Sequence, residues 1–160
     1  MLIRAMLAWV VAVGLLFTGC KGGHDDHDHD HGKDGGHERH HHDPPHGGTG
    51  VTLGDEDFHL EFLREDDKMT AWILAAHMSG FTRIKAESFE VTAKVNGKDE
   101  ALVFKAVANP ATGETVGNTS MFQAQAEWLK SATNFDAVVK EIIIKDKTYK
   151  AVPFNFPKGN

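Results

Sequence analysis

Cysteine is almost absent from this sequence, since Cys20 is the only one in 160 residues. A single cysteine excludes an intramolecular disulfide and a thiolate cluster for metal. Positive charge is also scarce: 17 Lys and Arg face 23 Asp and Glu, which gives a formal net charge of −6 with neutral His. Nucleic-acid binding needs a basic patch or stripe. We therefore expect no nucleic-acid partner.

Recognisable catalytic motifs are missing as well. Ser79, Ser88 and Ser120 have no nucleophile-elbow context. No His-Glu-x-x-His sequence lies in a predicted helix, and the chain contains no P-loop and no dinucleotide fingerprint. We expect a protein that is not an enzyme. A metal-dependent hydrolase whose site is assembled from distant residues is the alternative that these absences leave open.

The chain has one long hydrophobic run, at its front. Arg4 is followed by apolar residues and glycine from Ala5 to Phe17. This run has the length of the apolar region of a secretory signal and is short for a membrane span. Residues 1–19 are therefore interpreted as a signal peptide, which indicates export.

The end of this run resembles a bacterial lipoprotein lipobox. The residues that carry the resemblance are Leu16-Phe17-Thr18-Gly19-Cys20, with Phe17 where an aliphatic residue is commoner. The resemblance implies cleavage after Gly19 and attachment to the membrane through lipid on Cys20. Lys21, in place of Asp, implies sorting to the outer membrane, with the protein facing the periplasm or the cell surface.

A polar tract follows, and it is the richest feature of the sequence. Nine of the eleven histidines lie in the 23 residues from 24 to 46, interleaved with aspartate. A segment without hydrophobic residues cannot build a core, so residues 20–50 are predicted to be a disordered, lipid-anchored tract. Its composition is typical of metal binding. The candidate metal ligands are His24, His27, His29, His31, His37, His40, His41, His42, His46, Asp28 and Asp30.

Imidazole and carboxylate together suit a divalent transition metal. We expect Zn²⁺ first, because availability usually decides, with Ni²⁺ or Cu²⁺ as alternatives. Alternation such as His27-Asp28-His29 offers many ligand sets and favours none of them. The pattern therefore predicts several sites of moderate affinity and low selectivity. A hydrated spacer without a metal function is the other interpretation.

From Val51 the pattern changes to period two. Phe58, Leu60 and Phe62 alternate with polar residues, and Asn96-Gly97 is a strong hairpin signal. Seven or eight short strands with turn signals between them predict an all-β domain over residues 51–160. The best match is an antiparallel β-sandwich of immunoglobulin-like type.

A candidate second metal site lies in this domain. His59 and Glu61 are two apart on a predicted strand and therefore share a face. His77 lies at the end of the next predicted strand, which runs from Met69 to His77. The alternative for the first two is an ordinary polar hairpin face, and for His77 a partly buried, hydrogen-bonded side chain.

The whole chain resembles small His-rich exported bacterial proteins in which a His/Gly/Asp leader precedes a compact β domain. The residues concerned are Leu53-Gly54, Phe58-His59-Leu60-Glu61, Ser120-Met121-Phe122, Leu129 and Tyr149. The resemblance implies heavy-metal handling.

Two functions are therefore expected. The first is a lipid-anchored extracytoplasmic protein that buffers or delivers a divalent metal, with a transporter or efflux component as its partner. The second is a structural or protein-interaction lipoprotein, in which the tract is only a spacer.

Overall fold

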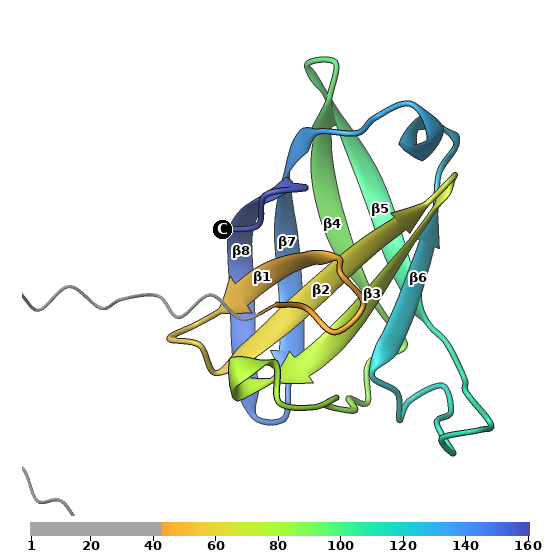
Figure 1. Ribbon diagram of the computed structural model, residues 1–160, viewed down its shortest axis with the longest axis vertical. Coiled ribbons are helices and arrows are strands. Elements are labelled where there is room, and N and C mark those ends of the chain that lie inside the picture. The colour runs from red at the N-terminus through yellow and green to blue at the C-terminus, as the bar shows by residue number, and fades with distance from the viewer. Residues whose placement is uncertain (1–42) are drawn as a thin grey trace, which may run out of the picture. The chain divides into compact units, whose positions relative to one another are not determined.

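The computed structural model describes residues 43–160, which form eight strands and two short 3₁₀ helices (Figure 1). In chain order these are β1 (Thr49–Leu53), β2 (Phe58–Glu65), β3 (Lys68–Ala75), η1 (Ala76–Met78), β4 (Ser88–Val95), β5 (Lys98–Ala106), β6 (Met121–Gln125), η2 (Glu127–Lys130), β7 (Phe135–Ile144) and β8 (Lys147–Phe156). Every pair of neighbouring strands is antiparallel. The expected all-β class is confirmed.

Tight turns set the register of the hairpins. Asn96 and Gly97 both have positive φ, 50° and 76°, between β4 and β5. Two central residues at positive φ are typical of the turn that follows the natural twist of a hairpin. Lys145, at φ 55°, lies in the turn between β7 and β8.

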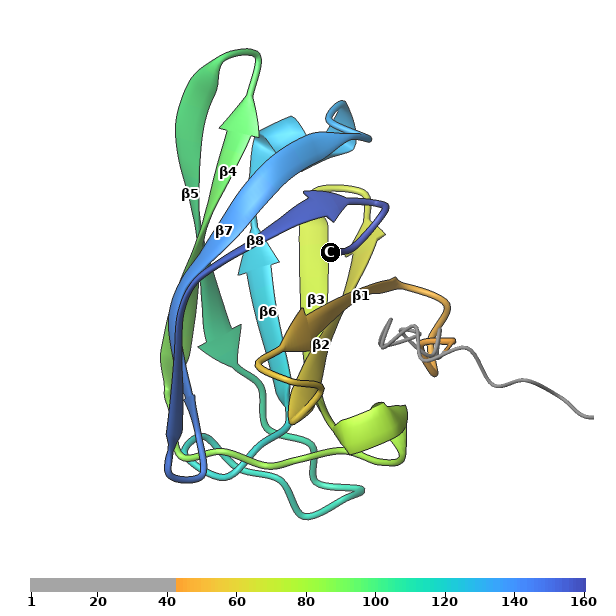
Figure 2. The same cartoon turned by 90° about the vertical axis from the view of Figure 1, so that its left-hand side faces the viewer.

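All eight strands belong to one sheet, in the order β1-β2-β3-β6-β5-β4-β7-β8. The sheet curls until β1–β3 face β4, β7 and β8 across the interior (Figure 2). The arrangement thus has the two facing layers of a sandwich, but β6 joins them by hydrogen bonds on both of its edges. Two separate sheets of the immunoglobulin-like kind would have no such bridging strand.

Side chains, and not a strand ladder, bring the two outer strands together. The Asn160 side chain accepts from Thr52 N at 2.8 Å and donates to Thr52 O at 3.2 Å. In the turn that follows β1, Asp57 accepts from Lys147 Nζ at 2.6 Å and from the Tyr149 hydroxyl at 3.1 Å. These contacts hold the β1 edge against the β8 side of the molecule.

The sheet is looser between β5 and β6. Their ladder consists of Lys105 opposite Gln123 and Ala106 opposite Phe122. Among the residues that the structure describes, the earlier part of β5 is paired with β4 alone.

Aromatic side chains fill the space inside the curled sheet. Phe62 of β2 stacks on Phe154 of β8 with ring centroids 4.8 Å apart, and Phe89 of β4 stacks on Phe104 of β5 at 4.9 Å. Phe122 of β6 meets Phe89 edge-on at 5.3 Å. Offset stacked and edge-to-face pairs are favourable arrangements beyond the area they bury. The core therefore ties strands from both halves of the sheet.

The folded part begins earlier than the sequence predicts. Residues 43–50 were expected to belong to a disordered tract, and for these eight residues the expectation is wrong. Gly47 N donates to Pro44 O at 3.0 Å, and Thr49 and Gly50 pair with β2 as part of β1. A Cβ at Gly48 would lie 2.6 Å from Phe62 O. Glycine at position 48 permits close packing on β2. The Gly-rich composition of this segment, taken alone, suggests a linker.

Candidate functional site

Most of the candidate metal ligands lie outside the described residues. Outside them lie the predicted signal peptide over residues 1–19, the predicted lipidation site Cys20, and every tract ligand except His46. The ligands outside are His24, His27, His29, His31, His37, His40, His41, His42, Asp28 and Asp30. Their roles remain predictions.

His46, the final histidine of the tract, is held by Glu61 of β2. The Nδ1 atom of His46 lies 2.8 Å from Oε2 of Glu61. The other carboxylate oxygen, Oε1, accepts from His46 N at 2.8 Å and from Gly48 N at 2.9 Å. The Glu61 side chain has no exposed surface, while 34% of the His46 side chain is exposed. The end of the tract thus supplies the hydrogen bonds that this buried carboxylate needs.

Aromatic rings fix the plane of the His46 imidazole. The ring stacks on Trp72 with centroids 3.9 Å apart and planes 16° from parallel. Phe81 lies beside it at 5.7 Å, tilted by 42°. The ring therefore has one face covered by indole and one nitrogen committed to a carboxylate.

The strand register explains why these groups meet. Glu61 of β2 is directly opposite Trp72 of β3, and Trp72 is opposite Met121 of β6. Directly opposite residues project from the same face of an antiparallel sheet. This is the face away from the core, because Leu60, Ile73 and Phe122 project inward. We call Glu61, Trp72, Phe81 and the docked His46 the His46 site.

The segment before β1 and the loop after β3 cover the outer face here. Leu74 is fully buried although it does not belong to the main core cluster, and it forms an isolated bridge with Phe81. The Met78 Cε atom lies 2.8 Å from where a Cβ on Gly50 would stand. The loop 76–82 and the segment 43–48 thus form a second, small layer on β1–β3.

This layer changes the interpretation of His59 and His77. His59 is 3% exposed, so the alternative of a solvent-facing polar strand is wrong for both His59 and Glu61. His77 is exposed in η1 with φ 55°, not at the end of a regular strand. Within residues 43–160, no three His, Cys, Asp or Glu side chains are grouped to hold a metal ion. The structure therefore does not gather His59, Glu61 and His77 into one site.

The sequence indicates both His46 and Glu61 as candidate ligands but does not pair them. They are separated by 15 positions, and no periodicity links a tract residue to a strand residue. The available signal was local. Pro44-Pro45 stiffens the chain just before His46, and Gly47-Gly48 just after it allows a tight turn and a close approach.

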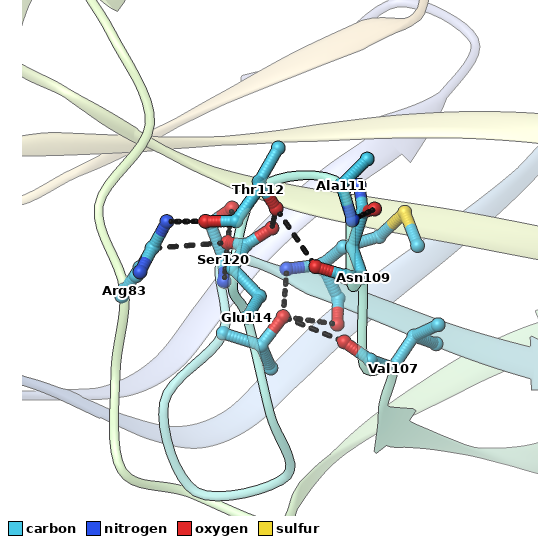
Figure 3. Close-up of polar contacts among 9 residues, drawn as sticks. Arg83, Val107, Asn109, Ala111, Thr112, Glu114 and Ser120 are labelled. Carbon is cyan, nitrogen blue, oxygen red and sulfur yellow. Dashed lines mark hydrogen bonds and ion pairs between the residues drawn. The ribbon is translucent and has the colours of Figure 1, made fainter.

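A second polar cluster surrounds Glu114 in the connection between β5 and β6 (Figure 3). Oε1 of Glu114 accepts from Ser120 N at 2.9 Å and from Ser120 Oγ at 2.6 Å, and Oε2 accepts from Thr112 Oγ1 at 2.7 Å. Arg83 Nε lies 3.5 Å from Oε1, and Arg83 Nη2 donates to Thr112 O at 2.6 Å. Each of these polar groups already makes a hydrogen bond or an ion pair with another group of the cluster. The role of the cluster is therefore to hold the conformation of the loop.

Two opposing effects, burial and polar contacts, set the pKa of Glu114. Burial of the carboxyl favours its neutral form and acts to raise the pKa. Hydrogen bonds from Ser120 and Thr112, together with the charge of Arg83, outweigh burial, and the net result is a lowered pKa. The ionised carboxylate is therefore the form that this loop is built around.

No protein-family model matches the chain, and no significant match to it was found among the curated proteins or the solved structures. Within residues 43–160, no helix has the length and apolar character needed to cross a bilayer.

Proposed function

We propose that the protein is a lipid-anchored extracytoplasmic metal-binding protein that buffers or delivers a divalent transition metal. The His/Asp tract supplies the ligands, with Zn²⁺ favoured and Ni²⁺ or Cu²⁺ as alternatives. Lipid on Cys20 attaches the chain to the outer membrane, facing the periplasm or the cell surface. A metal transporter or efflux component is the partner to which such a protein delivers its metal.

One observation carries the proposal. By sequence His46 belongs to the tract, and by its contacts it belongs to the β domain. A spacer needs no bond between its side chains and the domain that it carries. The fixed imidazole at the junction supports a tract that works together with the outer face of β1–β3.

The tract and the domain are assigned different tasks. Interleaved histidine and aspartate provide capacity, because many two- to four-ligand sets can form. The domain provides a rigid surface, and sites built on strands are held more exactly than sites on loops. The His46 site lies where these two parts of the chain meet.

Calorimetric titration of the full chain in detergent with Zn²⁺ tests the proposal. Replacing the eight histidines from His24 to His42 by Asn keeps the length and polarity of the tract and should remove most of the bound Zn²⁺. The matched control is His77→Asn, which removes an exposed histidine of the domain and should leave the stoichiometry unchanged. Equal binding by the wild type and the eight-fold variant, or no binding by either, would favour the spacer.

A further inference from the structure

An extended segment after β3 alternates between buried and exposed side chains. Thr82 N donates to Ile73 O at 2.8 Å, and Ile84 N donates to Thr119 O at 2.9 Å. These bonds, made at the two buried positions, fix residues 81–85 against the sheet. The exposed side chains of this segment are those of Phe81, Arg83 and Lys85.

The connection between β5 and β6 lies beside this segment, at the end of the sheet opposite the β4–β5 turn (Figure 1 and Figure 2). Arg83 Nη2 donates to Thr112 O at 2.6 Å, and a Cβ on Gly117 would stand 3.8 Å from Lys85 O. The residue before Gly117 is Val116, which is exposed. We call these exposed side chains together the Phe81 surface: Phe81, Arg83, Lys85 and Val116.

No carboxylate is exposed in the two segments that form the Phe81 surface, residues 79–86 and 107–120. Their charged side chains are Arg83, Lys85 and Glu114. Two cations and one carboxylate give these segments a net charge of +1, whereas the whole chain carries −6. Glu114 is buried and bonded inside its own cluster, so Lys85 carries the charge that is free to act outward. The first exposed carboxylate beyond them is Glu87.

Two large apolar side chains project from this surface. Phe81 is 53% exposed and Val116 is 58% exposed. A single exposed apolar side chain is ordinary. Here two adjoining connections each present one, with cations between them. Apolar area that enters the headgroup region, and cations close to anionic lipid, are the two contributions that hold a protein on the surface of a bilayer.

The upstream chain reaches the domain on the same side. The structure describes the chain from residue 43, and the ring of His46 lies 5.7 Å from the ring of Phe81. A membrane attachment before residue 43 therefore joins the domain beside Phe81. Such an attachment favours contact through the Phe81 surface over contact through the far end at the β4–β5 turn.

We propose that the Phe81 surface docks the β domain on an anionic lipid bilayer, with Phe81 and Val116 entering the headgroup region and Lys85 beside the lipid phosphates. The inference goes beyond the proposed function and needs no bound metal. The contact is small, so it orients a domain that is already at the membrane and does not replace a lipid anchor. A tether alone sets no orientation, whereas this contact turns the β4–β5 turn away from the bilayer.

A quenching experiment tests the contact. Cys20 is the only cysteine, so the full chain with Cys20→Ser accepts a fluorescent probe at one new cysteine. The probe is placed at Val116→Cys and, as a distal control, at Lys98→Cys after the β4–β5 turn. The vesicles contain phosphatidylcholine with or without phosphatidylglycerol, and a lipid with a nitroxide on its acyl chain. We expect quenching at position 116 that increases with phosphatidylglycerol, and little quenching at position 98.

Variants identify the side chains that make the contact. At a fixed excess of lipid, the ratio of quenched to unquenched probe at position 116 compares docked with undocked domains. Phe81→Ser should lower this ratio about five- to tenfold, because about half of a phenylalanine side chain leaves water on docking. Lys85→Gln should lower it about fivefold in anionic vesicles and little in neutral ones. The matched control is Val103→Ser, which changes a side chain on β5 that is 47% exposed and should have no effect. All three side chains are exposed, so the variants are expected to fold.

Three results would overturn the inference. The first is no quenching at position 116 in anionic vesicles, and the second is equal quenching at positions 116 and 98. The third is a probe signal at position 116 that changes with protein concentration without lipid, because a second copy of the chain would then cover the surface. Neither metal nor lipid on Cys20 enters the measurement, so each of these results leaves the proposed function standing.

Discussion

At the scale of single residues, Tyr149 is the clearest case of an environment changing a group's chemistry. Its hydroxyl donates to Asp57 at 3.1 Å, and the residue as a whole is 8% exposed. Burial, with the bond to Asp57 and its charge, raises the pKa of Tyr149 to about 12. Lys147 and Tyr149, by their hydrogen bonds, lower the pKa of Asp57.

The raised pKa predicts a specific loss of stability in alkali. A group whose folded-state pKa is raised stabilises the fold fully below its unfolded pKa and less as pH rises through the folded value. The contribution of Tyr149 to the free energy of unfolding should therefore decrease between pH 10 and about 12. Tyr149 is the only tyrosine, so tyrosinate absorbance reports it alone.

The control is Tyr149→Phe, which should remove the part of the alkaline destabilisation that is due to the phenol. Lysines that are not in contact with Asp57 lose their protons in the same pH range in both proteins, so their effect cancels in the comparison. A tyrosinate midpoint near 10 in the folded wild type would show that the hydroxyl does not make the bond to Asp57.

At the scale of elements, the connection from β5 to β6 depends on Glu114. Glu114→Gln removes the charge and turns one acceptor into a donor facing Thr112 or Ser120. Hydrogen bonds to charged groups contribute about 1.5–3 kcal/mol each. The variant should lose stability by about this amount at neutral pH, measured by urea unfolding.

The pH dependence gives a second check on Glu114. Its pKa is lowered in the folded state, so its contribution is present above the unfolded value of 4.5 and is lost as pH falls through the folded value. The difference between wild type and Glu114→Gln should therefore shrink in acid. Glu127→Gln, at an exposed carboxylate, should show no comparable difference at either pH.

Some strands can be predicted from the sequence, and others cannot. Alternation at Phe58, Leu60 and Phe62 and the Asn96-Gly97 turn predict strands and hairpins correctly, because these signals are local. The start of β1 at Thr49 was missed, because a Gly- and His-rich segment has no apolar period. It forms a strand only because β2 offers it a partner.

The same reasoning applies to the site. His59 and Glu61 sharing a face follows from strand geometry, but their burial does not. A segment 15 positions earlier covers Glu61, and a loop after β3 covers the same face. Both are tertiary contacts, and single-strand periodicity carries no information about them.

At the scale of the molecule, Asn160 helps to close the sheet. Its side-chain amide pairs with both backbone groups of Thr52, as a neighbouring strand would. Asn160→Ala should open this part of β1. We expect hydrogen exchange at Thr52 N to be about fivefold faster, corresponding to a net hydrogen bond of about 1 kcal/mol.

Lys158→Ala is the matched control, since it changes an exposed residue of the same segment. It should leave exchange at Thr52 unaltered. Unchanged exchange in Asn160→Ala would show that β1 is held by its ladder with β2 alone.

The location of the whole protein is tested at Cys20. Cys20→Ser should abolish partitioning into membranes, because the thioether to lipid cannot form. Fractionation of cells with an antibody to the β domain measures this. His46→Asn, which leaves residues 16–20 unchanged, should still partition with membranes. A Cys20→Ser protein that sediments with membranes would contradict lipidation at this residue.

The short ladder between β5 and β6 has a consequence for association between molecules of this protein. The first part of β5 has hydrogen-bonding groups that no described strand other than β4 pairs. Such an edge is a template on which a second chain can grow an aggregate. Lys98, Asp99 and Glu100 lie along it, and charges of both signs disfavour that growth. Neutralising all three should therefore lower the concentration at which the domain precipitates.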